Sequence, residues 1–396
     1  MLEECAGQVV AGVMEFEWVS TMGRLRSLAQ DLAVKPLLAV DTEFVRVDTF
    51  YPLPGLLQMA DREQAWLVDP LALPRPHELA RVFYGDACTK VLHACFEDLE
   101  VLEQLTQLRC RAIFDTQLAA AYLGHGLQIG YQKLLQEELA ITIRKEESRS
   151  DWLQRPLTPE QLRYAVQDVE HLLPLYDRLQ QRLQALGHWE RVLEDNLLLL
   201  SEVPEPVEPE LVYRDVANAW RLKRQQLAVL QALCLWRETE AVRRNMPRSF
   251  LLRNNSLLPL AQQQPVHKSQ LALVEGMTPR ILRREGDALL EVIRTAQHSN
   301  AAAWPALLPW PWPRELRDIM MGLKQALEPQ AAVLGLPLDV LIRKRHYEEL
   351  LECFMRQREP RARWLGWRHD VVFEPAMHYL APHRDELEQW QARRWR

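Results

Sequence analysis

The chain has 396 residues, 48% of them hydrophobic, which is enough to bury more than one core. It has no uncharged apolar run of the roughly 18 residues that a membrane span needs, and its first residues are acidic where a secretory signal is basic. Its six cysteines show no CxxC pair and no zinc-site spacing, which favours free thiols in a reducing compartment. We therefore expect a cytoplasmic protein of two or three domains with no membrane association.

Charge is distributed unevenly along the chain. Residues 1–212 contain 34 acidic and 19 basic side chains, residues 213–296 contain 7 and 14, and residues 297–396 contain 13 and 15. An acidic half followed by a basic segment fits a protein in which one part holds cations and another attracts a polyanion. The alternative is that charge simply varies from segment to segment.

Short β-type runs alternate with helical stretches through the first half, as in PLLAVDTEFV, PGLLQMAD, AWLVDP and KVLHACFEDLEVLEQL. This alternation predicts an α/β domain with a mixed sheet over residues 1–200. In the first run, Asp41 and Glu43 are two residues apart and project to one side of the strand, while Thr42 and Phe44 project to the other. Neighbouring carboxylates repel unless a cation lies between them, and Mg²⁺ or Mn²⁺ prefers carboxylate oxygens. The alternative is an exposed edge strand with two solvated acids.

Two further acids lie on predicted helices. In TKVLHACFEDLEVL a strand passes into a helix whose first turns contain Asp98, and the carboxyl ends of parallel strands are where sites assemble. Asp98 can also be read as an acid that favours a helix N-terminus. In LTPEQLRYAVQDVEHLLPLYDRL, Thr158 and Gln161 predict a capping box, so Tyr164 and Asp168 share one face of the helix. A proline at position 174 should kink the helix beyond them.

The second half has a different pattern. SEVPEPVEPELV (201–212) has no apolar period and predicts an extended, solvated linker. Helical periodicity dominates afterwards, as in VANAWRLKRQQLAVLQALCLWRETEAVRRN (216–245), until PALLPWPWPRE (305–315) interrupts it. We expect two all-α domains, 213–296 and 297–396.

The ordered set of DxE on a strand, Asp at a strand-to-helix junction and YxxxD on a later helix resembles the three motifs of the DEDD exonuclease superfamily, in its tyrosine subtype. VDTEFVR, YPLPGLLQMA, VLHACFEDLEVL, FDTQLAAAYLG and YAVQDV stand in the order found in the ribonuclease D family, over residues 34–190. LCLWRETEAVRRNMPRSFLLRNNSL and LALVEGMTPRILRREGDALLEVI resemble its HRDC domain, and the last hundred residues look like a divergent second copy. The resemblance implies a ribonuclease H-like (DnaQ-like) exonuclease domain followed by two HRDC-type domains.

The resemblance also implies roles for individual residues. Asp41, Glu43, Asp98 and Asp168 would hold two divalent cations, Mg²⁺ or Mn²⁺, and Tyr164 would orient the attacking water. Asp41 would bridge the cations, and Asp98 would act partly through water. Two such cations lower the pKa of a water and stabilise charge on the leaving oxygen, so no separate base is required.

Other residues have a structural and a functional reading. Phe44 matches a family position near the terminal nucleotide and could stack on a base, or it is a core residue. His93 is a candidate for substrate binding, or a histidine satisfied by neighbours at a strand end. Asp115 reads as a helix N-cap, and Cys95 has no partner that would make it a nucleophile.

Seven basic side chains are candidates for phosphate contacts, unless they form a solvated helix face. They are Arg221, Lys223, Arg224, Arg243, Arg244, Arg248 and Arg253. We expect the tryptophans of the proline-rich stretch, Trp304, Trp310 and Trp312, to pack between helical modules rather than stack on bases.

Together these features predict a metal-dependent, monomeric 3′-to-5′ exoribonuclease. By the resemblance, it trims 3′ ends of structured RNA such as tRNA precursors and releases nucleoside 5′-monophosphates. The alternatives are a DNA 3′-5′ exonuclease and a non-catalytic RNA-binding protein on the same scaffold. The complete set of four acids and Tyr164 argues against the last, because a retired site has no physical reason to keep repelling charges together.

Overall fold

The computed structural model describes residues 14–73, 76–143, 150–202, 208–356 and 360–394. The acidic N-terminal residues, including Cys5, lie outside this part of the chain. The chain divides into two compact units. The first contains Met1–Val45, Pro52–Val203 and Met321–Leu380, and the second contains Arg46–Tyr51, Pro204–Met320 and Ala381–Arg396.

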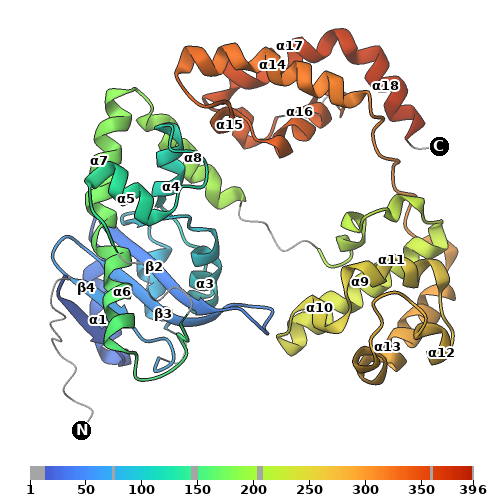
Figure 1. Ribbon diagram of the computed structural model, residues 1–396, viewed down its shortest axis with the longest axis horizontal. Coiled ribbons are helices and arrows are strands. Elements are labelled where there is room, and N and C mark those ends of the chain that lie inside the picture. Colours follow the sequence, from blue (N-terminus) through green and yellow to red (C-terminus); the bar gives the residue numbers. More distant parts are fainter. Residues whose placement is uncertain (1–13, 74–75, 144–149, 203–207, 357–359, 395–396) are drawn as a thin grey trace. The chain divides into compact units, whose positions relative to one another are not determined.

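A mixed six-stranded sheet is the centre of the first unit, as the sequence predicts (Figure 1). Its strands are β1 (Phe16–Val19), β2 (Leu37–Val45), β3 (Leu53–Ala60), β4 (Ala65–Val68), β5 (Thr89–Leu92) and β6 (Ile113–Asp115). The spatial order is β1-β4-β3-β2-β5-β6, with β3 antiparallel to β2 and β4 and the other pairs parallel. Sequential strands β2, β3 and β4 therefore form a meander at the middle of the sheet.

Helices of the first half surround this sheet. They are α1 (Met22–Leu32), α2 (Ala80–Phe83), α3 (Phe96–Thr106), α4 (Thr116–Tyr122), α5 (Tyr131–Leu139), α6 (Pro159–Glu170), α7 (Leu172–Ala185) and α8 (Trp189–Glu202), with the 3-10 turn η1 (His77–Leu79). Alternate residues of β3 face opposite cores: Leu56 packs in one apolar cluster, and Leu57 in the other. Because both faces are buried, the sheet is a rigid platform for side chains at its edge.

The predicted capping box at the start of α6 is present. Gln161 N donates to Thr158 Oγ1 at 3.2 Å, and Thr158 N donates to Gln161 Oε1 at 2.9 Å. The helix is interrupted at His171, and Pro174 lies in the first turn of α7, where a missing amide is tolerated. The predicted break therefore occurs three residues before the proline.

The described residues after position 207 form helices and no strand, which confirms the all-α prediction. The α-helices are α9 (Arg224–Arg244), α10 (Arg248–Leu251), α11 (Asn254–Gln263), α12 (Lys268–Leu271), α13 (Pro279–Gln297), α14 (Leu316–Leu334), α15 (Leu338–Leu341), α16 (Lys344–Arg356), α17 (Glu374–Leu380) and α18 (Arg384–Arg393). Shorter turns are η2 (Val212–Asp215), η3 (Ala219–Arg221), η4 (Ala301–Ala303), η5 (Ala362–Trp364), the π-helix η6 (His369–Phe373) and η7 (Ala381–His383). None of the described helices is long and apolar enough to cross a membrane.

Two local expectations for this half were wrong. The predicted extended linker begins with Ser201 still inside α8, and the N–H of Leu211 donates to the carbonyl of Glu208 at 2.7 Å, which closes a turn. Residues 203–207 of the linker lie outside the described residues. The helical pattern after it becomes α9 only at Arg224, because two short 3-10 turns, η2 and η3, come first, and Asn218 adopts a left-handed conformation (φ 64°) between them.

The helical half repeats one local pattern. The one-turn helices α10 and α15 follow Pro247 and Pro337, which have φ of −58° in both places. Each one-turn helix is followed by an extended residue and then by an arginine, Arg253 or Arg343, at the start of the next helix. Equivalent positions in the two repeats therefore carry the same side chain.

One close backbone approach holds β3 against the loop before α6. A Cβ atom at Gly55 would lie 2.8 Å from both Cβ and the carbonyl oxygen of the buried Trp152. The carbonyl of Gly55 also accepts a hydrogen bond from Arg155 Nη2 at 2.7 Å. Glycine is the residue that permits this approach.

We predict that Gly55→Ala lowers stability by about 1–3 kcal/mol, because Trp152 and its backbone must shift. The thermal unfolding midpoint measures this change. Gly23→Ala is the matched control, since a Cβ there, in the first turn of α1, meets no atom within 4 Å. Equal midpoints for the two variants would contradict the prediction.

Candidate active site

The site begins on β2. Its described pairing with β5 ends at Ala39, whereas its pairing with β3 continues past Asp41 and Glu43. The two acids therefore lie on the part of the strand that extends beyond β5, and a bulge follows directly after Glu43. A strand end with one side unpaired gives these carboxylates room for a ligand.

Three acids come together. Asp41, Glu43 and Asp168, from the last turns of α6, can each place one carboxylate oxygen within 4.8 Å of the others. α6 reaches this position because it packs on β2, β3 and β4. The expectation that strand acids meet the acid of the capped helix agrees with this geometry.

Asp98 stands slightly apart from these three. It is the third residue of α3 and buried, and its Oδ1 accepts a hydrogen bond from Thr42 Oγ1 at 2.5 Å. The charge of Asp98 is nevertheless close enough to raise the pKa of Asp41, Glu43 and Asp168. Thr42 projects from the side of β2 opposite Asp41 and Glu43, and its hydrogen bond thus connects that side of the strand to Asp98.

The electrostatics show the cost of this arrangement. Burial, followed by repulsion from Asp98, Asp168 and Glu43, raises the pKa of Asp41 well above its ordinary value. Burial and neighbouring carboxylates raise the pKa of Glu43 to about 9, and those of Asp98 and Asp168 to about 7. Hard divalent cations, which take carboxylate oxygens, would relieve this repulsion, so the donor set fits a metal.

Tyr164 lies one helical turn before Asp168, as expected from its spacing. A hydrogen bond from its hydroxyl lowers the pKa of Asp168, partly opposing the effect of burial. Burial and the nearby acids raise the pKa of Tyr164 itself, so the phenol stays protonated and can donate.

Sequence reasoning missed two polar side chains beside these acids. Gln58 is directly opposite Asp41 in the β2–β3 register, and both atoms of its buried amide have no hydrogen-bond partner. The buried hydroxyl of Tyr131, at the start of α5, is also unpartnered, and its pKa is raised by burial and by Asp168 and Asp41. Unpaired buried polar atoms are costly, which is consistent with water or a ligand in this site. The feature of the sequence that could have indicated this site is the polar Gln58 within the apolar run LLQMA.

Asp115 holds the loop that leads into α3. It caps α4 as predicted, accepting from Gln117 N at 2.8 Å, and it also accepts from the amides of Ala94 and Cys95 at 3.1 Å. Ala94 has a left-handed conformation (φ 59°), so this loop needs such support. The Asp115 carboxylate thereby fixes the start of the helix that carries Asp98.

The other candidates of the exonuclease domain take structural positions. Both ring nitrogens of His93 contact the protein, Nδ1 with Thr116 Oγ1 at 2.9 Å and Nε2 with the carbonyl of Ile129 at 3.0 Å. Phe44 is half-buried against an apolar cluster. Cys95 is a buried free thiol whose pKa is raised by burial. Substrate contacts by His93 and Phe44 stay predictions.

Several candidate phosphate contacts are occupied within the protein. Arg244 joins α9 to α13 through the buried Glu285, at 2.7 Å, and Arg243 pairs with a glutamate one turn earlier on α9. Arg224 donates to backbone carbonyls between residues 301 and 305. These three arginines therefore already have structural roles, and only part of the basic segment is available to a polyanion.

Arg221 and the tryptophans also pack locally. The guanidinium of Arg221 lies 4.9 Å from the ring centroid of Trp220, and that ring lies 5.1 Å from the ring of Trp310. The guanidinium of Arg394 lies 4.0 Å from the ring centroid of Trp312. Packing of the tryptophans, as expected, accounts for these contacts.

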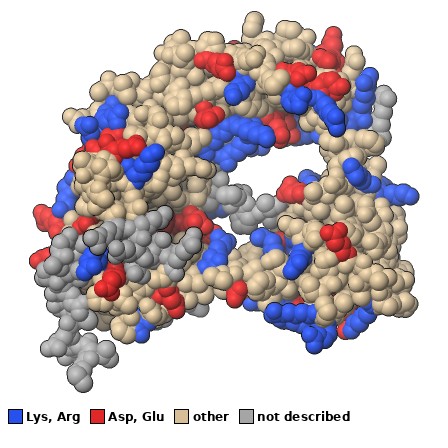
Figure 2. Space-filling model, viewed as in Figure 1, with Lys and Arg blue, Asp and Glu red and all other residues tan. Residues whose placement is uncertain are grey.

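A basic cleft of ≈ 340 Å³ lies in the second unit. Its lining residues are Arg46, Thr49, Phe50, Pro247, Arg248, Ser249, Arg253 and Asn254. Arg248 pairs with Glu238 at 2.6 Å and lies over the ring of Phe50, whereas Arg253 is exposed and pairs with no described acid. Figure 2 shows more Lys and Arg than Asp and Glu on the visible face of the helices around this cleft.

Comparisons with known proteins agree with this geometry. Residues 16–184 match the family model described as 3′-5′ exonuclease, and residues 226–293 match the HRDC domain. The chain is 43% identical over 339 residues to ribonuclease D of Pseudomonas paraeruginosa, covering 85% of this chain and 90% of the relative. It is 32% identical over 372 residues to ribonuclease D of Escherichia coli, covering 93% and 98%.

A solved structure gives the same result. The crystal structure of Escherichia coli RNase D superimposes with a TM-score of 0.88 at 31% identity, covering 93% of this chain and all of that one. Fold and site thus define a 3′-5′ exonuclease of the metal-dependent DnaQ-like class, joined to an HRDC domain. The chain belongs to the ribonuclease D family. It is a 3′-5′ exoribonuclease, which decides against the DNA exonuclease and the non-catalytic alternative.

We predict that the metal-free protein loses stability as pH rises from 6 to 8.5. Asp98 and Asp168 have a folded pKa of about 7, above the unfolded value of roughly 4, so the folded state binds more protons between these values. The resulting loss of folding stability is absent below the unfolded pKa and complete above the folded pKa. Thermal midpoints in EDTA should fall by several degrees, and Mg²⁺ should restore them at pH 8.5.

Asp168→Asn removes one of these titrating groups and should flatten the profile. Asp177→Asn, at an exposed ion pair on α7, is the control and should leave the profile unchanged. A midpoint that is independent of both pH and Mg²⁺ would contradict the electrostatic account.

Proposed function

We propose that Asp41, Glu43, Asp98 and Asp168 hold two divalent cations, Mg²⁺ or Mn²⁺, that serve phosphodiester hydrolysis. The observation that carries the proposal is the approach of three carboxylates to within 4.8 Å, with a fourth close enough to raise their pKa values. When bound, such cations lower the pKa of water and stabilise charge on the leaving oxygen.

The chain's own residues would prepare this site. Asp41 interacts with every other acid of the group, which fits a central position between two cations. The hydrogen bond from Thr42 holds the Asp98 carboxylate slightly apart from the other three acids. Asp98 would therefore act partly through water. The protonated Tyr164 hydroxyl, fixed by Asp168, would orient the attacking water.

The substrate proposed is the 3′ end of a structured RNA such as a tRNA precursor, shortened to release nucleoside 5′-monophosphates. The Escherichia coli relative is described as an exoribonuclease involved in structured RNA processing. We propose that Arg253, Arg248 and Arg46 of the basic cleft contact RNA phosphates, with Phe50 as a stacking surface.

The same proposal includes the organisation of the chain. Residues 1–200 would form the exonuclease domain, 201–212 a connecting segment that begins inside α8 and is turned at 208–211, and 213–296 and 297–396 two HRDC-type domains, which the repeated pattern around α10 and α15 supports. The buried free thiols of the five described cysteines fit a monomeric protein of a reducing cytoplasm.

We predict that Asp168→Asn lowers Mg²⁺-dependent trimming of a 3′-extended tRNA by about 1,000-fold or more, because a carboxylate ligand is lost. Gel analysis of a 5′-labelled RNA measures the rate. Glu160→Gln, exposed on the same helix, should retain wild-type activity. Full activity of Asp168→Asn would contradict the assignment of Asp168 as a metal ligand.

We predict that Arg253→Gln weakens RNA binding about equally across sequences and reduces the slope of log affinity against log salt by about one. Fluorescence anisotropy with a labelled tRNA at several salt concentrations measures both. Arg243→Gln is the control, because Arg243 is paired with Glu240 on its own helix. Identical salt slopes for Arg253→Gln and the wild type would exclude this contact.

A further inference from the structure

A buried glutamine next to the acidic site has no hydrogen-bond partner. Gln58 lies on β3, and 0% of its surface is exposed. Both its amide oxygen and its amide nitrogen are without a partner among the described residues. The amide has two donors and two acceptor positions, and leaving them unused in a buried place is unfavourable. This side chain therefore calls for a partner that the protein itself does not supply.

The register of the sheet shows on which side that partner can lie. Residues directly opposite each other on antiparallel strands project to the same face, as do residues two apart on one strand. The neighbours of Gln58 on its face are Asp41 on β2, Leu67 on β4, and Leu56 and Ala60 along β3. The last three are buried members of one apolar cluster. Asp41 is thus the polar neighbour among these four.

A second unpartnered group faces the same acids from a different element. The buried hydroxyl of Tyr131, at the start of α5, has no partner among the described residues. After burial, Asp168 and Asp41 are the largest causes that raise the pKa of this phenol, so both carboxylates are near it. The ring of His93 lies 5.4 Å from the ring of Tyr131, but both nitrogens of that histidine already contact other atoms.

The water shell of a cation has the hydrogen-bonding capacity that these two groups require. Mg²⁺ loses its water ligands reluctantly and usually keeps several when carboxylates bind it. Water on a cation donates hydrogen bonds, and the amide oxygen of Gln58 and the phenol oxygen of Tyr131 are acceptors. The N–H and O–H groups of the same two side chains can donate to carboxylate oxygens. Such contacts beyond the direct ligands orient those ligands and strengthen metal binding.

We propose that Gln58 and Tyr131 are positioning residues that bind the water ligands of a cation held by Asp41. The inference rests on the cation sites proposed above and adds two residues to them. Neither residue has to contact the reacting phosphate. Both fix the Asp41 carboxylate and the hydrated cation from the buried side of the site.

The test compares thermal unfolding of the full chain in EDTA and in Mg²⁺ at pH 8. Gln58→Met puts an apolar side chain of similar length in place of the amide. In EDTA it should unfold at the wild-type temperature or above it, because an unpartnered polar group has been removed. At a Mg²⁺ concentration of ten times the wild-type dissociation constant, its midpoint increment should be roughly 2 °C smaller, as about tenfold weaker cation binding requires.

Enzyme assays provide a second measurement on the same variant. The Mg²⁺ concentration for half-maximal trimming of a 3′-extended tRNA should rise about tenfold, while the KM for RNA stays unchanged. A side chain with a merely structural role would change the midpoint in EDTA and leave this Mg²⁺ dependence as it is.

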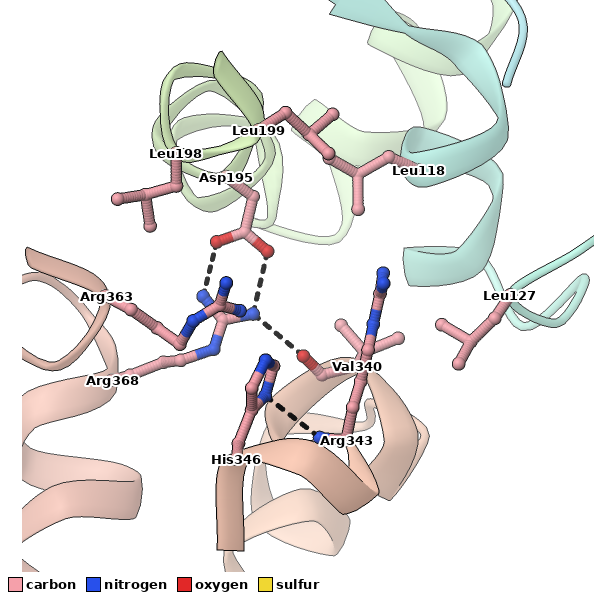
Figure 3. Close-up of a pocket in the computed structure, with 10 residues that line it drawn as sticks. All are labelled: Leu118, Leu127, Asp195, Leu198, Leu199, Val340, Arg343, His346, Arg363 and Arg368. Atoms are coloured by element: carbon pink, nitrogen blue, oxygen red, sulfur yellow. Dashed lines mark hydrogen bonds and ion pairs between the residues drawn. The ribbon is translucent and has the colours of Figure 1, made fainter. Parts of the chain in front are cut away.

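Tyr131→Phe removes a single hydroxyl and should change both measurements in the same directions. Tyr122→Phe is the matched control, since Tyr122 on α4 is also buried but its hydroxyl donates to Asp195 at 2.6 Å. Figure 3 shows Asp195 paired with Arg368, in a cavity of its own. The control should unfold at a lower temperature in EDTA and keep the full Mg²⁺ increment.

Two results would overturn the inference and leave the cation sites intact. One is a Mg²⁺ dependence of Gln58→Met equal to that of the wild type. The other is an EDTA midpoint of Gln58→Met clearly below the wild type, because the amide would then have a partner without the cation. If Gln58→Met fails to fold, the same two criteria apply to Tyr131→Phe. A wild-type midpoint that does not respond to Mg²⁺ would instead reject the cation sites themselves.

Discussion

Repulsion among carboxylates is the constraint on which the first unit depends. One carboxylate oxygen of each of Asp41, Glu43 and Asp168 lies within 4.8 Å of the others, and Asp98 adds its charge from α3. In water such groups would separate, but here β2 pairs with β3 and α6 packs on the sheet, so the backbone holds them together. The raised pKa values show that ionising these carboxylates together is unfavourable, and a divalent cation bound between them would relieve the repulsion.

The surroundings compensate for this local instability. The sheet is buried on both faces, and the capping box of Thr158 and Gln161 fixes the start of the helix that carries Asp168. Asp115 satisfies the amides of two segments at once and holds the loop before α3. Each acid of the site is thus attached to an element whose position is fixed by packing or by hydrogen bonds outside the site.

In the helical half, pairing matters more than the number of charges. The basic excess of residues 213–296 is partly neutralised inside the protein, as the contact of Arg244 with the buried Glu285 shows. Arg253 is exposed and pairs with no described acid, and it follows α10 in the same backbone pattern in which Arg343 follows α15. A solvent-facing arginine suits a flexible polyanion such as RNA.

The sequence by itself determined what depends on short spacing or on ordered motifs. The two-residue spacing of the strand acids, the capping box and the N-cap Asp115 are local, because they involve residues within one turn or one strand. The order of the motifs was enough to indicate the family. The tertiary structure alone decided that Thr42 holds Asp98, that Gln58 lies opposite Asp41, that the hydroxyl of Tyr131 is close enough to Asp168 and Asp41 for their charges to act on it, and which arginines are paired. These features depend on distances between residues far apart in the chain, and such distances follow from packing rather than from any periodicity in the sequence.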